Sequence, residues 1–262
     1  MSEHLGEVVV EHIERTVVIT INRPQARNSL TRPVLHAMRE ALAKAAVDPE
    51  VRCVIITGNG GHFCAGADLR KNMEDPDMFE KLPDYLDDFH GLIKGIVHCP
   101  KPVIAMIDGA AVGFGADIAF ACDFRVASTT AYIQEKFVKI GLMPDGGGTF
   151  WLPRLIGTSR AMQVILLGEE LEHKEMLDLG LLVELTSPTD LHAVTMALAK
   201  KIAAGPPLAH AAVKKALYAS LGSVDEALAR EREGQLALLR SSDCMEGIMA
   251  WAQKRAPEFQ GK

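Results

Sequence analysis

The sequence has no uninterrupted apolar run of the about 18–20 residues that a membrane-spanning helix needs. Residues 1–11 also lack the apolar stretch of a signal peptide. Lys and Arg form no block, and the formal net charge at pH 7 is −6. Because general nucleic-acid binding needs a basic face that displaces phosphate counterions, we expect neither a membrane nor a nucleic acid as a partner.

Cysteine is scarce and scattered along the chain. No two of the cysteines form a C-x-x-C pair, so the pattern indicates neither a disulfide framework nor a structural zinc site. His62 and Cys64 lie near Asp68, but no further ligand follows at a suitable spacing, and we expect no metal. A reducing compartment suits such a chain, and we expect it in the cytoplasm. The five cysteines are Cys53, Cys64, Cys99, Cys122 and Cys244.

The composition is that of a folded chain. Its 262 residues are 48% hydrophobic and 24% charged, and at this length one large domain, with or without an appendage, buries most of the unfolded surface. Two β-branched runs, Val8–Ile13 and Thr16–Ile21, predict a hairpin. Continuous apolar runs at 51–57 and 102–107 predict strands that are covered on both faces.

Helical patterns fill much of the remaining sequence. Thr31 and Thr158 are predicted N-caps of two helices. The segments predict an α/β core over residues 1–195 and a helical region over residues 196–262. Further helices are expected over 85–97 and 113–122, from 146–148 onward, and almost throughout 191–254, where 206–207 begins one helix and 222–223 separates two.

Three tight turns of small residues attract attention as backbone donor sites. Residues 113–115 lack the third glycine of a dinucleotide-binding G-x-G-x-x-G, and residues 146–148 lack the Lys-Ser/Thr of a P-loop. Like the turn at 63–68, each follows a strand, and a helix start leaves backbone N–H groups free at the positive end of its dipole. Two such turns facing one point would form an oxyanion hole, although glycines often do no more than turn the chain.

Six segments resemble the enoyl-CoA hydratase/isomerase (crotonase) superfamily, and with their spacing they span essentially the whole chain. The resemblance implies an α/β fold with a crotonase-like ββα spiral core and a C-terminal helical trimerisation region, assembled as a homotrimer or hexamer. It implies an acyl-CoA substrate, with coenzyme A as part of the substrate and no separate cofactor. The segments are 63–69 (FCAGADL), 101–109 (KPVIAMIDG), 113–117 (GFGAD), 121–123 (ACD), 141–149 (GLMPDGGGT) and 153–157 (PRLIG).

The resemblance places the thioester carbonyl oxygen between the N–H groups of Ala67 and Phe114. Ala65, Gly66 and Gly113 belong to the same two turns and are expected to contact the substrate. Phe114 stands where the family usually has glycine. Since only the N–H is needed, the donor survives, but the benzyl group is expected to reshape the floor of the pocket.

Two arginines match positions at which family members hold the CoA phosphates. They are Arg27 and Arg70, and the planar guanidinium fork suits a phosphate. The alternative for each is a solvated surface arginine. By the same resemblance, Lys254 and Phe259 would reach the CoA site of a neighbouring subunit.

The acid/base positions depart from the family pattern. Hydratases of the superfamily use two glutamates, and here Asp117 occupies the first position and Phe137, which moves no proton, the second. Glu135 lies two residues earlier, an offset too large to assume that it substitutes. Two-glutamate hydration is therefore in doubt, and Phe137 is expected only to line the substrate pocket.

Asp145 is then the strongest candidate for the catalytic acid/base. Family isomerases, including dienoyl-CoA and ring-epoxide types, carry an aspartate at this place, and the tail over 243–262 also resembles the ring-epoxide isomerases of phenylacetate degradation. A single carboxylate can move a proton between two carbons if an oxyanion hole stabilises the enolate. The alternative role for Asp145 is an N-cap, which contributes about 1 kcal/mol to the following helix.

Other reactions stay open at this point. Hydration with Asp117 or Asp145 activating water shares the same enolate. His90 with Asp145 would suit aroyl-CoA dehalogenase-like hydrolysis, although those enzymes have a tryptophan where this chain has Phe137. His90 is otherwise a residue of an amphipathic helix or a polar group in the substrate pocket, and a crotonase-fold binding protein without catalysis is the alternative of another class.

Overall fold

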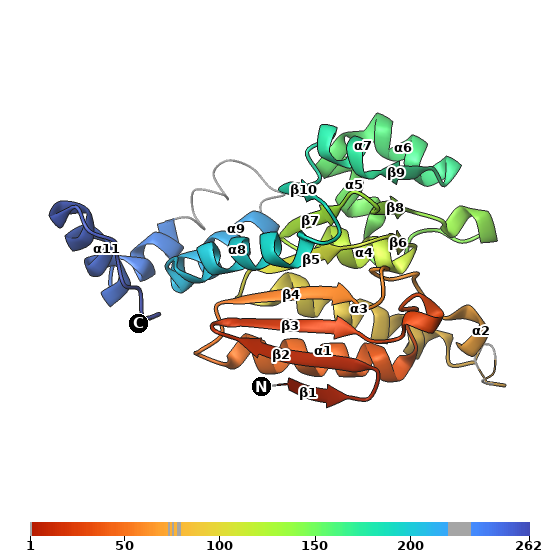
Figure 1. The fold of residues 1–262 in the computed structure, drawn as a ribbon, viewed down its shortest axis with the longest axis horizontal. Helices are drawn as coiled ribbons and strands as arrows, with labels where there is room; N and C mark the ends of the chain where they lie inside the picture. The colour runs from red at the N-terminus through yellow and green to blue at the C-terminus, as the bar shows by residue number, and fades with distance from the viewer. Residues whose placement is uncertain (1, 73, 75, 78–79, 220–231) are drawn as a thin grey trace.

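A computed structural model describes residues 2–72, 74, 76–77, 80–219 and 232–262 (Figure 1). Its centre is a seven-stranded sheet in the order β1-β2-β3-β4-β5-β7-β10. The predicted hairpin is confirmed, and from β3 onward every neighbouring pair of strands is parallel. The strands are β1 (Ser2–Leu5), β2 (Val8–Ile13), β3 (Thr16–Ile21), β4 (Cys53–Gly58), β5 (Val103–Ile107), β7 (Phe124–Ser128) and β10 (Glu184–Thr186).

A smaller sheet and a set of helices complete the described part of the chain. The sheet has the order β6-β8-β9, formed by β6 (Ala110–Val112), β8 (Tyr132–Gln134) and β9 (Glu170–Glu172). The α-helices are α1 (Arg32–Val47), α2 (Leu69–Asn72), α3 (Leu82–His98), α4 (Phe114–Ala121), α5 (Gly148–Ile156), α6 (Thr158–Leu167), α7 (His173–Asp178), α8 (Leu191–Ala203), α9 (Pro207–Ala219) and α11 (Ser242–Gln253), and the 3-10 helices are η1 (Pro24–Ala26) and η2 (Phe137–Ile140).

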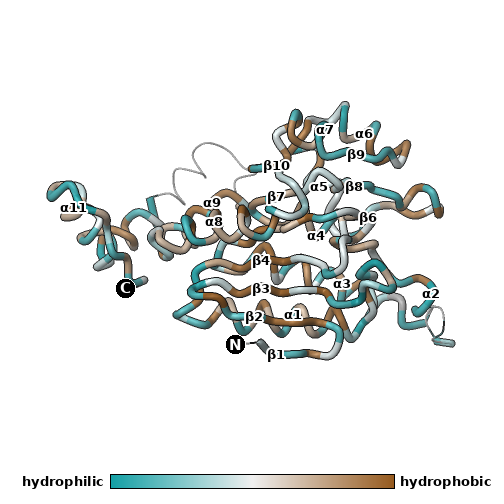
Figure 2. Tube along the Cα trace, in the orientation of Figure 1, coloured by the Kyte–Doolittle hydropathy of each residue, from teal (hydrophilic) through white to brown (hydrophobic). Residues whose placement is uncertain are grey.

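The core lies on both faces of the parallel strands, as their continuous apolar runs predict. Successive side chains of a strand point to opposite faces. Ile19 and Ile56 therefore join the cluster that includes α1 and α3, whereas Val18 and Ile55 join a second cluster with α8. Figure 2 shows the strands β3 and β4 as mainly hydrophobic between more hydrophilic loops.

Helix α4 is buried along its whole length, and its small residues allow this close packing. Its carboxyl end leads to Asp123, which ties the helical tail to the core. The Asp123 carboxylate accepts hydrogen bonds from the Lys214 ammonium at 2.7 Å and from the Tyr218 hydroxyl at 3.0 Å. Both donors belong to α9, so this helix is fixed to the core of its own chain by a buried ion pair.

One predicted helix start is misplaced, and one predicted helix break cannot be compared with the structure. Thr158 was expected to cap a helix, but it is the first residue of α6, and Gly157 occupies the N-cap with a φ of 76° that favours glycine. The break predicted at 222–223 lies outside the described residues. In the described part of the chain, no helix combines the length and apolar character needed to cross a bilayer.

Candidate active site

The candidate site lies where the parallel strands end. In open sheets of this kind, ligands bind beyond the carboxyl ends of the strands, where the loops meet. Here the loops after β3, β4 and β5 are joined by isolated parallel bridges, Leu30 to Ala67 and Cys64 to Ala111. The Leu30 N–H donates to the Gly66 carbonyl at 2.8 Å, which fixes the turn that carries Ala67.

This packing brings the two predicted donor turns together. A Cβ atom on Gly66 would lie 3.3 Å from the Phe114 nitrogen and 2.7 Å from the Val112 carbonyl oxygen, so the backbones of the two turns are in direct contact. Phe114 is the first residue of α4, where an N–H has no earlier helical turn to bond. The hydrogen bonds that hold these turns in the described chain use neither the Ala67 N–H nor the Phe114 N–H.

The two phenylalanines of the site have different surroundings. The Phe114 ring is 2% exposed and packs edge-on against Phe89, with ring centroids 4.5 Å apart. A Cβ atom on Gly146 would lie 2.7 Å from this ring, so the ring fills the space beneath Gly146. Phe137 lies beside Gly113, whose Cβ position is 3.9 Å from the Phe137 ring, and it gives this side of the site an apolar wall.

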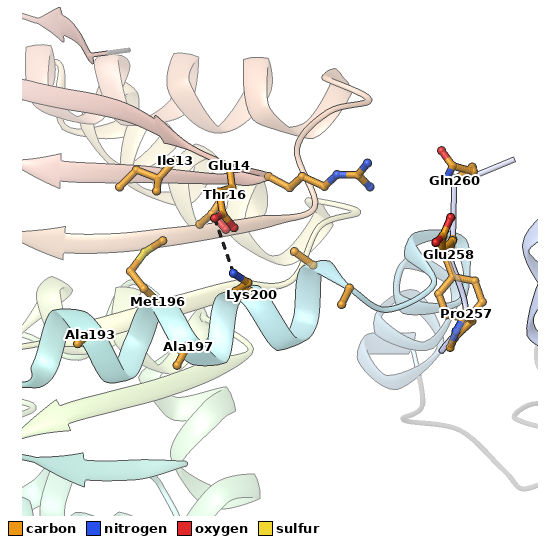
Figure 3. A pocket seen from close by; sticks show the side chains of 14 residues that line it. Ile13, Glu14, Thr16, Ala193, Met196, Ala197, Lys200, Pro257, Glu258 and Gln260 are labelled. Atoms are coloured by element: carbon orange, nitrogen blue, oxygen red, sulfur yellow. Dashed lines mark ion pairs between the residues drawn. The ribbon is translucent and has the colours of Figure 1, made fainter. Parts of the chain in front are cut away.

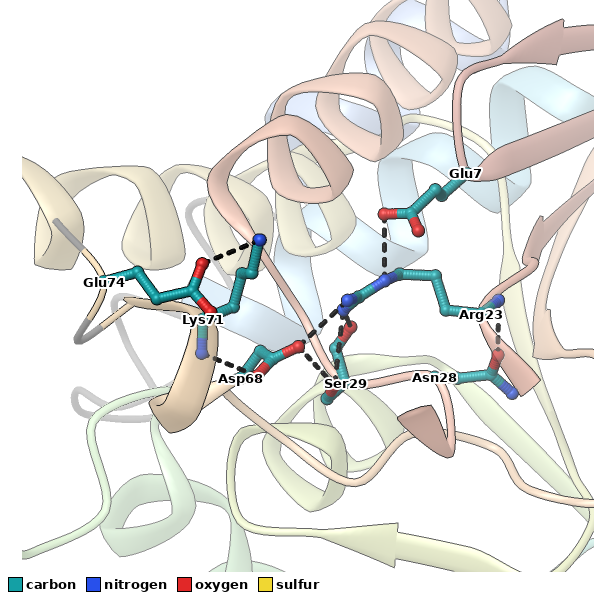
Figure 4. A network of polar contacts seen from close by, with 7 residues as sticks. All are labelled: Glu7, Arg23, Asn28, Ser29, Asp68, Lys71 and Glu74. Atoms are coloured by element: carbon teal, nitrogen blue, oxygen red, sulfur yellow. Dashed lines mark hydrogen bonds and ion pairs between the residues drawn. The ribbon is translucent and has the colours of Figure 1, made fainter. Parts of the chain in front are cut away.

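A polar network holds the loop that carries Ala67 (Figure 4). The Arg23 guanidinium lies at its centre, 2.9 Å from Asp68 and 2.9 Å from Glu7. The Ser29 hydroxyl also donates to Asp68 at 3.0 Å. Burial alone would raise the pKa of Asp68, but hydrogen bonds from Lys71, Arg23 and Ser29 lower it below its usual value. The network thus holds a charged carboxylate one residue after Ala67.

Replacing Arg23 with Met is expected to lower the free energy of unfolding by about 2 kcal/mol, because the Asp68 carboxylate loses its cation. Urea unfolding at pH 7 measures this change. Arg15 is exposed at the β2–β3 turn, and Arg15→Met is expected to change stability by less than about 0.5 kcal/mol. Equal losses in the two variants would contradict the role given to the network.

Three carboxyl groups gather next to the donor turns. Asp117 on α4 and Glu135 between β8 and η2 are fully buried, whereas Asp145 is half-buried. The Gly146 N–H donates to Asp117 Oδ2 at 3.0 Å, which joins the turn after Asp145 to α4. Sequence reasoning identified Asp117 and Asp145 but set Glu135 aside.

Glu135 reaches the cluster because the chain does not stay extended after β8. The strand ends at Gln134 and the 3-10 helix η2 begins at Phe137, so the two residues in between turn the chain. A Cβ atom on Gly148 would lie 2.5 Å from Glu135 Oε1 and 2.9 Å from Asp117 Oδ1. The sequence offered one signal, a charged residue just after a short apolar strand. This signal does not show to which side of the strand the Glu135 side chain turns.

The cluster changes the ionisation of all three acids. Burial, with the charge of Asp145 acting in the same direction, raises the pKa of Asp117 to about 7. Burial and the charges of Asp117 and Asp145 raise the pKa of Glu135 well above its usual range. Burial also raises the pKa of Asp145, and His90 on α3 opposes part of this effect. Clustered acids whose pKa values are raised by burial and by one another are typical of sites that move protons.

The alternative reading of Asp145 as a helix cap is wrong. Gly147 occupies the N-cap of α5 with a φ of 100°, and Asp145 precedes it by two residues. One carboxylate oxygen of Asp145 is buried and has no hydrogen-bond partner among the described residues. His90 acts electrostatically on Asp145, an interaction that the hydrolase hypothesis requires and the isomerase hypothesis does not.

The two predicted phosphate ligands lie on the rim of the site. Arg27 and Arg70 are exposed, and neither forms an ion pair with a described residue. The Arg27 carbonyl accepts a hydrogen bond from the Ala65 N–H at 3.0 Å, so Arg27 is joined directly to the donor turn. Across residues 2–72, 74, 76–77, 80–219 and 232–262, no group of three His, Cys, Asp or Glu side chains has the arrangement of a metal site.

A separate cavity lies at the other end of the parallel strands (Figure 3). It has a volume of about 650 Å³ and lies between the β2–β3 turn, α8 and residues 257–260. Glu14 and Lys200 form an ion pair of 3.8 Å across it. It contains none of the three clustered acids, and the donor turns lie at the opposite ends of the strands.

The fold and site together define a mixed α/β protein with two unused backbone donors beside a half-buried carboxyl, a combination typical of enzymes that stabilise an oxyanion. The model of the enoyl-CoA hydratase/isomerase family matches residues 12–262. The chain belongs to this family, and its fold is the crotonase fold that the sequence segments predict.

Relatives that are named for different activities match over nearly the whole chain. A probable enoyl-CoA hydratase from Rhodobacter capsulatus is 38% identical over 95% of this chain and 96% of its own. The 1,2-epoxyphenylacetyl-CoA isomerase from Escherichia coli is 34% identical over 98% of this chain and 99% of its own. The crystal structure of enoyl-CoA hydratase from Bacillus anthracis superposes with a TM-score of 0.93 at 30% identity, covering 98% of this chain and 100% of that one.

Proposed function

We propose that this protein moves a double bond in an enoyl-CoA or a ring-containing acyl-CoA, with Asp145 as the acid/base. One observation carries the proposal. Of the three clustered carboxyls, Asp145 is the one that is partly exposed, and the next residue, Gly146, contacts both Asp117 and the Phe114 ring. A ligand entering beside the donor turns would therefore meet Asp145 before the two recessed acids.

In this mechanism the thioester oxygen accepts hydrogen bonds from the N–H groups of Ala67 and Phe114. The Asp145 carboxylate removes a proton from the α carbon of a 3-enoyl thioester, and the negative charge collects on the thioester oxygen as the dienolate forms. The protonated Asp145 then returns the proton to the γ carbon, which gives the 2-enoyl thioester. The raised pKa of Asp145 suits a group that both accepts and releases a proton.

Product analysis tests the proposal. The protein is incubated separately with a 2-enoyl-CoA and a 3-enoyl-CoA of the same chain length, and the thioesters are separated by chromatography. Interconversion of the two enoyl thioesters without a hydroxyacyl product supports isomerisation. Accumulation of the 3-hydroxyacyl-CoA as the main product would overturn it in favour of hydration, the activity for which the Rhodobacter relative is named.

A second candidate is hydrolysis of a halobenzoyl-CoA, which the position of His90 near Asp145 favours. The Asp145 carboxylate would attack the ring carbon and displace halide, which leaves an aryl ester on Asp145. His90 would activate a water that hydrolyses this ester, giving the hydroxybenzoyl-CoA and restoring the carboxylate. Continuous halide release by wild type that stops at about one halide per site in His90→Ala supports this reaction. Phe137 weakens it, because its ring donates no hydrogen bond to a thioester.

Arg27→Ala and Arg70→Ala are each expected to raise KM for an acyl-CoA about tenfold with little change in kcat, because each removes one charge-assisted contact to phosphate. Steady-state kinetics at low salt measures this effect. Raising the salt concentration should reduce the difference from wild type, since both arginines are exposed. The control variant Arg15→Ala is expected to leave KM unchanged, and a rise there of similar size would contradict the assignment.

We also propose that the chain assembles as a homotrimer or as a hexamer. Large apolar side chains on the tail helices support this assembly, because they are exposed in the single chain. Light scattering of the purified protein measures its mass. The side chains include Val213 and Leu217 on α9 and Ile248, Met249 and Trp251 on α11.

A further inference from the structure

The two recessed acids behind Asp145 are Asp117 and Glu135. Their carboxyl groups lie so close together that both cannot be ionised. Asp117 Oδ1 and Glu135 Oε1 both lie within 3 Å of one point, the Cβ position of Gly148. Neither atom has a hydrogen-bond donor among the described residues when both groups are ionised, and neither has Glu135 Oε2. Two buried carboxylates so close would repel strongly, whereas one proton between them turns the contact into a hydrogen bond.

Among the residues that the structure describes, no cation and no hydrogen-bond donor faces the Glu135 carboxyl. The titratable groups that face it are Asp117 on α4 and Asp145 before α5, and His90 on α3 acts on Asp145. Asp117, in contrast, has the Gly146 N–H as a donor to its other oxygen. Of the two recessed acids, Glu135 is therefore the one that keeps the proton, and Asp117 is the one that accepts it.

We propose that Glu135 is a positioning residue, which donates its O–H to Asp117 and thereby sets the orientation and ionisation of Asp117 behind the Asp145 site. The inference rests on the proposed function only for its catalytic consequence. Through the Gly146 N–H, Asp117 holds the turn that carries Asp145, so Glu135 acts on the reaction through Asp117 without contact with the substrate. The pKa of Asp117, raised to about 7, is lower than it would be without this hydrogen bond.

Two substitutions separate this role from simple packing. Glu135→Gln retains an N–H donor toward Asp117, whereas Glu135→Met removes the donor and keeps the volume. Methionine has about the volume of glutamate and no carboxyl group that must be desolvated on burial, so the Met variant is expected to fold. Gln134→Met places the same new side chain one residue earlier, and the strand directs it to the other face.

The test is a carbon-13 NMR titration of the Asp117 carboxyl in the full chain, with its signal assigned through Asp117→Asn. We expect a midpoint near pH 7 in wild type, in Glu135→Gln and in Gln134→Met. In Glu135→Met the midpoint is expected to rise by about one pH unit, because loss of a hydrogen bond to the charged form disfavours ionisation. A midpoint in Glu135→Met equal to that of wild type would overturn the proposal.

The pH profile of kcat/KM supplies the catalytic readout. A limb that follows Asp117 should move upward in Glu135→Met and return to its wild-type position in Glu135→Gln, whereas a merely structural residue would move it in neither. If no enoyl-CoA is converted by wild type, the proposed function fails and the NMR titration still decides the role of Glu135. If catalysis is present but the limb is unchanged in Glu135→Met, the catalytic consequence of Glu135 is refuted.

Discussion

Asp145→Asn is expected to lower kcat for enoyl-CoA isomerisation about 10³-fold and to change KM little. General acid–base catalysis by one positioned side chain contributes about 10²- to 10⁴-fold to the rate. Asparagine keeps the shape of aspartate but cannot remove a proton from the α carbon of the substrate. The Ala67 and Phe114 donors remain, so binding of the thioester should persist. Steady-state kinetics with a 3-enoyl-CoA measures both constants.

Asp117→Asn is the matched comparison, because it makes the same chemical change at a fully buried acid. A loss of water addition in Asp117→Asn that spares Asp145→Asn would overturn the isomerase assignment.

The stability of Asp145→Asn as a function of pH provides a check on folding. Because the pKa of Asp145 is raised in the folded state above its usual 3.8, its stabilising effect is present at low pH and is lost as pH rises. Asp145→Asn should therefore gain stability relative to wild type as the pH rises above about 4.

Gly66→Ala is expected to lower kcat about 10²-fold, the effect of losing one donor of an oxyanion hole. The new Cβ would lie 2.7 Å from the Val112 carbonyl oxygen, and the φ of 87° at this position is strained for alanine. Relief of the contact must separate the two donor turns. The Ala67 and Phe114 N–H groups then no longer point at the same thioester oxygen. Kinetics with the same 3-enoyl-CoA measures the loss.

Gly61→Ala is the control for backbone strain. Gly61 has a similar φ of 80° in the same loop, but a Cβ there would meet nothing within 4 Å. We expect it to cost about 1 kcal/mol of stability, as a strained backbone does, and to leave kcat unchanged. Equal losses of activity in the two variants would mean that loop strain, rather than the position of the donors, limits the reaction.

Most of the fold could be predicted from the sequence because its elements follow strong local patterns. The β-branched runs of β2 and β3 favour a hairpin, and the apolar runs of β3 and β4 favour strands that are buried on both faces of a sheet. The N-cap of α6 was misplaced by one residue, since Thr158 has a capping side chain but Gly157 has the backbone freedom that this turn requires. Such choices depend on the path of the chain, which a residue type alone does not encode.

The candidate site shows the same division. Ala67, Phe114 and Asp145 lie in motifs whose spacing identifies them, and the structure brings their turns together. Glu135 was set aside because it lies two residues before the family position that Phe137 occupies. In a continued strand, this offset would keep its carboxyl away from the position of the second catalytic acid. The 3-10 helix that begins at Phe137 removes this assumption, and only tertiary packing shows that Glu135 turns toward α4.

Helix α4 links the helical tail to one of the two backbone donors. At one end is the Phe114 N–H, and at the other is Asp123, to which α9 is bonded through Lys214 and Tyr218. The eight residues of α4 span about 12 Å, so the contacts that fix α9 lie one short, fully buried helix away from the Phe114 amide. In the proposed trimer or hexamer, a contact on the tail would be linked through α4 to the amide that polarises the thioester carbonyl.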